Sequence, residues 1–135
     1  MRKSIGALLA AAAMIALPIT ADARPRLDPE AKLAKILAGR DAGEPVHCIH
    51  TPSIRKVQII EKTAIVYDAG NVIYVNRPAS GASSLRNDDV LVTKLTIPQL
   101  CNVDIVHLRD RGLGFPTGTV GLGDFVPYRK VGWGH

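Results

Sequence analysis

The sequence has few aromatic residues and no cluster of positive charge. Aromatic residues make up 4% of its 135 residues, and its 17 Lys and Arg residues are scattered among 12 Asp and Glu residues. Proteins that bind single-stranded nucleic acid combine stacked aromatic side chains with a continuous basic groove. The composition therefore argues against nucleic-acid binding. The excess of positive charge predicts an ordinary solvated surface, with some attraction to the anionic surfaces of a bacterial envelope.

The sequence also lacks an apolar run long enough to cross a bilayer. Its longest run, Ile5 to Leu17, has about 13 residues, whereas a membrane-spanning helix needs about 20. The basic residues Arg2 and Lys3 precede this run and Ala-Asp-Ala follows it at residues 21–23, which is the layout of a secretory signal peptide. We therefore expect residues 1–23 to be a signal peptide, and the mature protein to be periplasmic or secreted, with no membrane span.

The first part of the mature chain, residues 24–45, predicts a short helix and a linker. In the segment LDPEAKLAKILAG, Asp28 suits the N-cap, Pro29 the first helical position, and Gly39 a left-handed C-cap. Apolar residues recur in it at helical spacing, so the helix is amphipathic. The segment RDAGEP, residues 40–45, has the Gly and Pro content of a linker.

Residues 46–128 have the pattern of a single β domain, and residues 129–135 form a C-terminal tail. Val, Ile, Thr and Tyr occur in short runs that Gly, Pro, Asn and Asp separate. The predicted strands are residues 46–50, 56–61, 64–68, 72–76, 90–96, 104–110 and 123–128. Six or seven short strands without intervening helices predict a mainly β fold, a small antiparallel barrel or sandwich, with the N-terminal helix outside it.

Two segments of this domain carry turn or loop signals. In AIVYDAGNVIYVN, residues 64–76, the residues Asp-Ala-Gly-Asn join two β-rich runs, which predicts a hairpin. The segment PASGASSLRNDD, residues 78–89, is polar and rich in Gly and Ser, which predicts an exposed loop. A role in a turn or a cap explains the acidic pair Asp88-Asp89 within it.

The sequence has two cysteines, Cys48 and Cys101. Export would place both in a compartment where disulfides form and persist, and two cysteines allow one intramolecular pairing. Closing a loop of this length would stabilise a small domain by about 4 kcal/mol. We therefore predict a disulfide between Cys48 and Cys101. Free thiols, an intermolecular pairing and metal ligation are the alternatives.

The histidines beside Cys48, in VHCIH at residues 46–50, raise the alternative of a metal site. On a strand, His47 and His50 point to opposite faces, whereas Cys48 and His50 share one. Cys48 and His50, together with Cys101 and His107, could supply Cys2His2 zinc ligands. These residues lack the close paired spacing of such sites, and a disulfide would use both thiolates. The sequence therefore predicts that the protein binds no metal and no cofactor. For the alternative of a metal site, the candidate ligands are His47, His50 and His107.

No catalytic constellation stands out. The Gly-x-Ser-x-Gly elbow and the lysine of a nucleotide-binding loop are absent, and Asp104 and His107 fall on opposite faces of a strand. The predicted function is therefore a non-catalytic binding or structural module of the cell envelope. We expect it to bind an envelope component or a protein partner through the loops at residues 78–89 and 112–123.

The alternative function is a metal-dependent or hydrolytic envelope enzyme. It would use His47, His50 or His107, since histidine serves both as a metal ligand and as a general base.

Five motifs occur in a fixed order along the β domain. They are TAIVYDAGNVIYVNRP, DDVLVT, QLC, GFPTG and, most specifically, LGDFVPY. In this order the chain resembles a family of small exported proteins of unknown function from Gram-negative bacteria, over about residues 46–128. The resemblance implies no established activity, ligand or catalytic residue. It supports the boundaries of the β domain and the disulfide, and it leaves the mechanism open.

Overall fold

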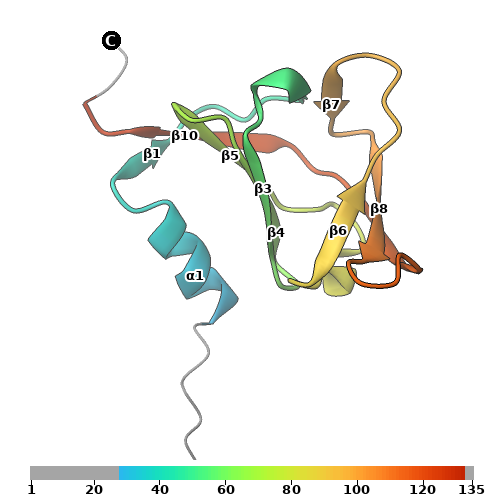
Figure 1. Ribbon diagram of the computed structural model, residues 1–135. Helices are drawn as coiled ribbons and strands as arrows, with labels where there is room; N and C mark the ends of the chain where they lie inside the picture. The colour runs from blue at the N-terminus through green and yellow to red at the C-terminus, as the bar shows by residue number, and fades with distance from the viewer. Residues whose placement is uncertain (1–27, 133–135) are drawn as a thin grey trace, which may run out of the picture.

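The computed structural model of this chain describes residues 28–132, which form a mainly β fold with one short α-helix (Figure 1). The helix α1 (Pro29–Ile36) comes first, and two 3-10 turns, η1 (Thr51–Ser53) and η2 (Ala82–Ser84), lie among the strands. The ten strands of this region are β1 (Arg40–Ala42), β2 (Cys48–His50), β3 (Lys56–Ile60), β4 (Ala64–Asp68), β5 (Val72–Asn76), β6 (Asp89–Val92), β7 (Gln99–Cys101), β8 (Ile105–Asp110), β9 (Pro116–Gly121) and β10 (Phe125–Lys130). The predicted signal peptide, residues 1–23, lies outside the described residues.

The strands form three antiparallel sheets. The largest has the order β1-β10-β5-β4-β3, the second pairs β2 with β7, and the third has the order β6-β8-β9. The described strands do not close into a barrel, because β1 and β3 end the first sheet and β6 and β9 end the third. Of the two predicted architectures, the structure is therefore sandwich-like.

Both faces of the five-stranded sheet are buried. One face packs against the two smaller sheets through the cluster Ile49, Ile59, Ile65, Tyr67, Leu85, Leu100, Val106, Leu108, Val120, Leu122 and Phe125. The other face packs against α1, where Leu33 joins the cluster Ile60, Ala64, Val66, Ile73 and Val75. This explains why the first four residues of β4 are all buried, without the alternation of a sheet that has one solvated face.

The predicted hairpin of β4 and β5 is confirmed, with both strands at the predicted residues. The Asp68 carboxylate accepts a hydrogen bond of 2.7 Å from the Gly70 N–H within the turn. Gly70 has a φ of +87°, which glycine adopts without the steric cost of a side chain. Turn chemistry and β propensity therefore agree here, which is why the local sequence is enough to predict the hairpin.

The predicted helix is also confirmed, and it forms the outer layer. Gly39 has a φ of +76°, as expected after a helix end, whereas Asp28 makes no side-chain capping bond. The helix is tied to the sheet by Glu30, which accepts two hydrogen bonds from the Arg77 guanidinium, at 2.7 and 3.0 Å. The hydrogen bond from Arg77 lowers the pKa of the Glu30 carboxyl.

Three strands, β1, β7 and β9, are absent from the sequence-based prediction. β1 lies in the predicted linker, residues 40–45, and pairs with β10 in the register of Arg40 with Lys130. β9 contains Gly118, a residue that weakens strands, but a Cβ there would lie only 3.0 Å from the Cβ of Ser84 in η2. Long-range pairing and close packing, rather than local propensity, produce these strands.

The predicted strand at residues 46–50 is divided between two sheets. Val46 forms an isolated bridge with Phe125, whereas β2 pairs with β7, and a bend at His47 separates the two. His47 therefore lies outside the strand on which its orientation was predicted. The alternation rule does not apply to it.

The segment at residues 78–89, predicted to be an exposed loop, is anchored in the core. Leu85 is fully buried, and its carbonyl accepts a hydrogen bond of 3.0 Å from the Lys62 N–H. Asp89 is also buried, and its carboxylate accepts a hydrogen bond of 2.6 Å from the Thr117 hydroxyl. The prediction is wrong at these two residues, because one apolar side chain within a polar segment is enough to hold it against the core.

Candidate binding cleft

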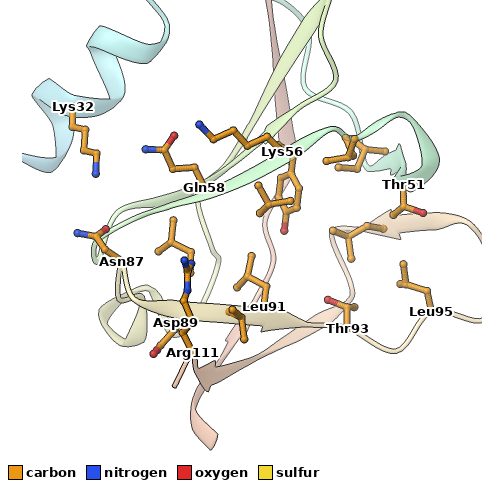
Figure 2. A pocket seen from close by; sticks show the side chains of 17 residues that line it. Lys32, Thr51, Lys56, Gln58, Asn87, Asp89, Leu91, Thr93, Leu95 and Arg111 are labelled. Atoms are coloured by element: carbon orange, nitrogen blue, oxygen red, sulfur yellow. The ribbon is translucent and has the colours of Figure 1, made fainter. Parts of the chain in front are cut away.

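A cleft of about 820 Å³ lies between strands β3 and β6 (Figure 2). β3 ends the five-stranded sheet and β6 ends the three-stranded sheet, so each presents a free edge. The hydrogen bond between Lys62 and Leu85 joins the segments that follow β3 and precede β6, and the two strands converge toward it in Figure 1. Cavities of this size hold small ligands or part of a peptide.

The inner wall of the cleft is apolar. Ile49 of β2 and Leu100 of β7 form a directly opposed pair there, and Ile59 and Tyr67 extend the wall along the five-stranded sheet. All four belong to one core cluster, and Leu91 of β6 packs against it. The cleft therefore offers a ligand an apolar surface that is continuous with the core.

The backbone of β3 presents hydrogen-bonding groups to this cleft. The Ala69 N–H in the β4–β5 turn donates to the Val72 carbonyl at 2.9 Å. Since alternate residues of an antiparallel strand bond to its two neighbours, the odd-numbered residues of β4 bond to β5 and the even-numbered residues bond to β3. The alternation pairs β4 with residues 56, 58 and 60 of β3. The backbone groups of Val57 and Ile59 consequently point away from β4, and no other segment within residues 28–132 bonds to them.

The backbone of β6 has the same property. The Asp110 N–H donates to the Phe115 carbonyl at 2.9 Å, so alternate residues of β8 face β9 and the remainder face β6. Val90 and Val92 consequently bond to β8, while the backbone groups of Leu91 point away from it. Within the described part of the chain, both walls of the cleft are therefore unpaired strand edges.

The rim of the cleft is mostly cationic. Lys32 of α1, Lys56 of β3 and Arg111 of the β8–β9 turn line it, and none of them has an ion-pair partner within the part of the chain that the structure describes. The carboxylate that lines the cleft, Asp89, is buried and bound to the Thr117 hydroxyl. The charges therefore favour an anionic ligand.

One hydroxyl of the inner wall has no hydrogen-bond partner among the described residues, 28–132. Tyr67 is only 4% exposed, and its ring lies edge-to-face with Phe125 at a centroid distance of 5.7 Å. No group within residues 28–132 hydrogen-bonds to the Tyr67 hydroxyl, although buried tyrosines usually have a partner. Burial raises the pKa of Tyr67, so the hydroxyl stays protonated and can donate. A ligand in the cleft could supply the missing acceptor.

Replacing Tyr67 by Phe is expected to leave the free energy of unfolding unchanged or to raise it by about 1 kcal/mol, because a desolvated polar group without a partner is itself costly. Urea-induced unfolding measures the change, with Tyr74→Phe at a half-buried position as the control. A loss above about 1 kcal/mol for Tyr67→Phe would mean that the hydroxyl has a partner in the unliganded protein.

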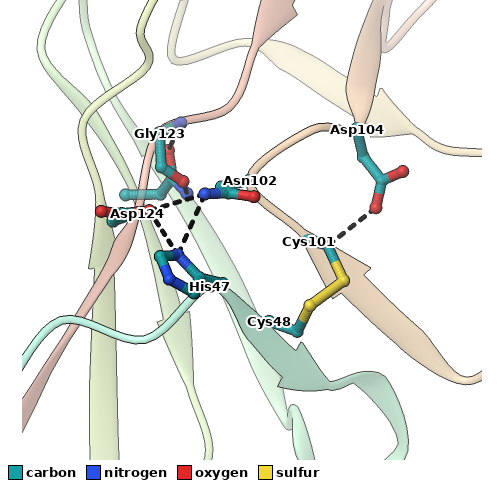
Figure 3. Close-up of a disulfide and its surroundings, with 8 residues drawn as sticks. His47, Cys48, Cys101, Asn102, Asp104, Gly123 and Asp124 are labelled. Carbon is teal, nitrogen blue, oxygen red and sulfur yellow. Dashed lines mark hydrogen bonds and ion pairs between the residues drawn. A yellow bond between two sulfur atoms is a disulfide. The ribbon is translucent and has the colours of Figure 1, made fainter.

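The predicted disulfide is present and supports the inner wall (Figure 3). Cys48 and Cys101 lie directly opposite each other on β2 and β7, with Sγ atoms 2.07 Å apart. The Asp104 carboxylate accepts a hydrogen bond of 2.7 Å from the Cys101 N–H and so holds the chain where it leaves β7. Since Ile49 and Leu100 are the next pair in register, the disulfide fixes the two side chains that close the back of the cleft.

His47 lies beside the disulfide in a polar cluster with Asn102 and Asp124 (Figure 3). Nδ1 of His47 is 3.1 Å from Oδ1 of Asp124, and Nδ2 of Asn102 donates to the same oxygen at 2.7 Å. The hydrogen bond from Asn102, followed by that from His47, lowers the pKa of the Asp124 carboxyl. The His47 side chain is 78% exposed. Within residues 28–132, its hydrogen-bond partners are Asp124 and Asn102, no hydroxyl hydrogen-bonds to it, and there is no free thiol.

Replacing Asn102 by Ala is expected to raise the pKa of Asp124 toward its ordinary value, because the largest cause of its lowering is removed. An NMR titration of the side-chain carboxyl carbon measures the pKa directly. Asn71→Ala, at an exposed turn position, is the matched control and should have no effect. An unchanged pKa in the Asn102 variant would contradict the hydrogen bond.

The other two candidate ligands, His50 and His107, lie outside this cluster. His50 is exposed on β2 opposite Gln99, and His107 is exposed on β8 between Val92 and Thr119 of the neighbouring strands. Within residues 28–132, no three His, Cys, Asp or Glu side chains are grouped as a metal site would require. The structure therefore does not gather the histidines that the sequence offered as ligands.

The sequence analysis placed binding on the loops at residues 78–89 and 112–123 and did not predict the cleft as a whole. The first of these segments contributes Asn87 and Asp89 to the lining of the cleft, whereas residues 116–121 of the second form β9. One signal was present: Lys56, Val57, Gln58 and Ile59 alternate between polar and apolar, which is typical of a strand with two different faces. That pattern does not say whether the strand ends a sheet. The edge position depends on the order of strands that are far apart in sequence.

The fold and the cleft define a small disulfide-bonded β-sandwich with one open side. No family model, curated protein or solved structure matches this chain. Neither α1 nor any other helix within residues 28–132 has the length and apolar character needed to span a bilayer. The function must therefore be inferred from the chemistry of the cleft.

Proposed function

We propose that this protein is an exported, non-catalytic binding module of the bacterial envelope, and that its ligand occupies the cleft between β3 and β6. The observation that carries this proposal is the cleft itself, where an apolar inner wall meets two unpaired strand edges beneath a cationic rim. Such a combination of apolar surface and a few convergent polar groups is typical of binding sites. The unpartnered Tyr67 hydroxyl adds a group that a ligand could satisfy.

Export is the second part of the proposal. Its support comes from the signal-peptide pattern of residues 1–23, from the resemblance to small exported proteins, and from the disulfide, which suits an oxidising compartment.

An NMR screen with small aromatic carboxylates, such as benzoate and indole acetate, tests the proposed site. We expect amide shifts concentrated on the residues that line the cleft, and binding that Lys56→Glu weakens by about fivefold. Lys35→Glu, an equally exposed charge reversal on α1, is the matched control and should bind as the wild type does. Shifts scattered over the surface, or equal effects of the two variants, would overturn the proposed site.

The enzymatic alternative has one observation in its favour. The contact of His47 with Asp124 orients an imidazole as carboxylates do in hydrolytic and metal sites. Titration of the protein with zinc, followed by the His47 ring signals, tests it: stoichiometric binding that His47→Ala abolishes would favour the enzyme.

A further inference from the structure

We propose that the ligand is an extended peptide segment rich in acidic residues, which adds to β3 as a sixth strand of the large sheet. This inference rests on the proposed function and names the ligand class for the same cleft. Three observations carry it: the free backbone groups of β3, the different chemistry of its two sides, and the cations along the rim.

The free backbone groups select an extended chain. The N–H and C=O groups of Val57 and Ile59 point into the cleft, two residues apart, at the spacing with which an antiparallel or parallel neighbour would bond to them. A peptide that adds to a sheet edge obtains its affinity from such main-chain bonds. A small molecule would leave most of them unused.

The two sides of β3 select the side chains of that peptide. On the side toward β6 the added strand would meet the apolar wall of Ile59, Ile49 and Leu100. On the other side it would meet Lys56 and Lys32, whose side chains lie on the α1 side of β3 in Figure 2. Because successive side chains of a strand alternate between its faces, the matching sequence alternates apolar and acidic residues.

β3 suits such a strand better than β6 does. β3 has five residues against four in β6, and the first residue of β6 is Asp89, whose carboxylate disfavours an acidic neighbour. In addition, α1 packs against the five-stranded sheet beside β3 and contributes Lys32 to the rim of the cleft. The added strand therefore continues the five-stranded sheet.

The inference is tested by fluorescence anisotropy with a short labelled peptide in which Glu and Val alternate. We expect saturable binding. Binding should be lost when Lys replaces Glu in the peptide, and also when methyl groups replace the amide hydrogens along the peptide edge that would bond to β3. Binding should weaken at least about tenfold in Val57→Pro, which removes an outward N–H without breaking the pairing with β4. Ala42→Pro, at an outward position of β1 on the opposite edge, is the matched control and should leave binding unchanged.

Each other outcome overturns the inference in a distinct way. If the aromatic carboxylates occupy the cleft but no alternating peptide binds, the ligand is a small anion and the proposed function stands. If neither binds, both proposals fail. If the protein forms a dimer that Val57→Pro dissociates, the occupant of β3 is a second copy of this chain. The N-methylated peptide keeps the test decisive if Val57→Pro does not fold.

Discussion

Replacing both Cys48 and Cys101 by Ala is expected to lower the free energy of unfolding by about 4 kcal/mol. The disulfide closes a loop with a sequence separation of 53, and it restricts the unfolded chain accordingly. β2 and β7 are three residues each, and they pair with each other in a sheet of their own. Because a small domain has only about 5–15 kcal/mol of net stability, the loss is a large share of the total.

Urea-induced unfolding followed by circular dichroism measures the change in this variant. Wild-type protein in strong reductant should unfold at nearly the same urea concentration as the double variant, whereas His50→Ala, beside Cys48 on the exposed face of β2, should unfold as the wild type does. A difference below about 1 kcal/mol between oxidised and reduced protein would contradict the structural role of the disulfide.

Replacing Asn76 by Ala is expected to cost about 3 kcal/mol, because it removes two hydrogen bonds of a fully buried side chain and leaves two partly buried backbone groups of Gly123 without partners. Asn76 is fully buried at the end of β5. Its Nδ2 donates to the Gly123 carbonyl at 2.7 Å, and its Oδ1 accepts from the Gly123 N–H at 2.9 Å. These two bonds fix the chain just before β10 begins, so their loss should loosen the junction of β5 and β10.

Thermal and urea-induced unfolding of Asn76→Ala measure this cost, and Asn71→Ala in the exposed β4–β5 turn serves as the control. Gly123 itself packs closely against the backbone of Arg77, since a Cβ at that position would clash with the Arg77 carbonyl. A cost below about 1 kcal/mol would mean that water or another group replaces the amide of Asn76.

The sequence was sufficient to predict the elements in which local and long-range preferences agree. β4 and β5 are rich in β-branched residues and are joined by Asp68 and Gly70, and α1 begins with Pro29 and is followed by a left-handed Gly39. The disulfide was predictable because only two cysteines exist. In each case a local signal or a single pairing decides the structure.

The elements that were missed depend on partners far along the chain. β1 is a polar segment of three residues that becomes a strand because β10 lies beside it, and β9 is a glycine-containing segment against which η2 packs. The polar cluster of His47 is similar, since Asp124 is 77 residues away in sequence. No periodicity within the segment itself reports such pairings.

The cleft could not be predicted for the same reason. Its walls come from β3 and β6, which are neighbours in neither sequence nor hydrogen bonding, and its inner wall comes from a third sheet. The alternation in residues 56–59 is typical of a strand with two different faces, but only the sheet order places that strand at an edge. The sequence analysis places binding on loops, the usual location, and the segment at residues 78–89 does contribute Asn87 and Asp89 to the lining of the cleft. The free backbone groups, in contrast, belong to the edge strands.

Amide hydrogen exchange at β3 tests the central claim most directly. In the presence of the alternating Glu and Val peptide, we expect exchange at Val57 and Ile59 to slow by about tenfold or more, because their N–H groups gain strand partners. Exchange at Gln58, which already pairs with β4, and at Ala42 on the opposite edge should not change. Unchanged exchange at Val57 and Ile59, under conditions where the peptide is bound, would contradict the account.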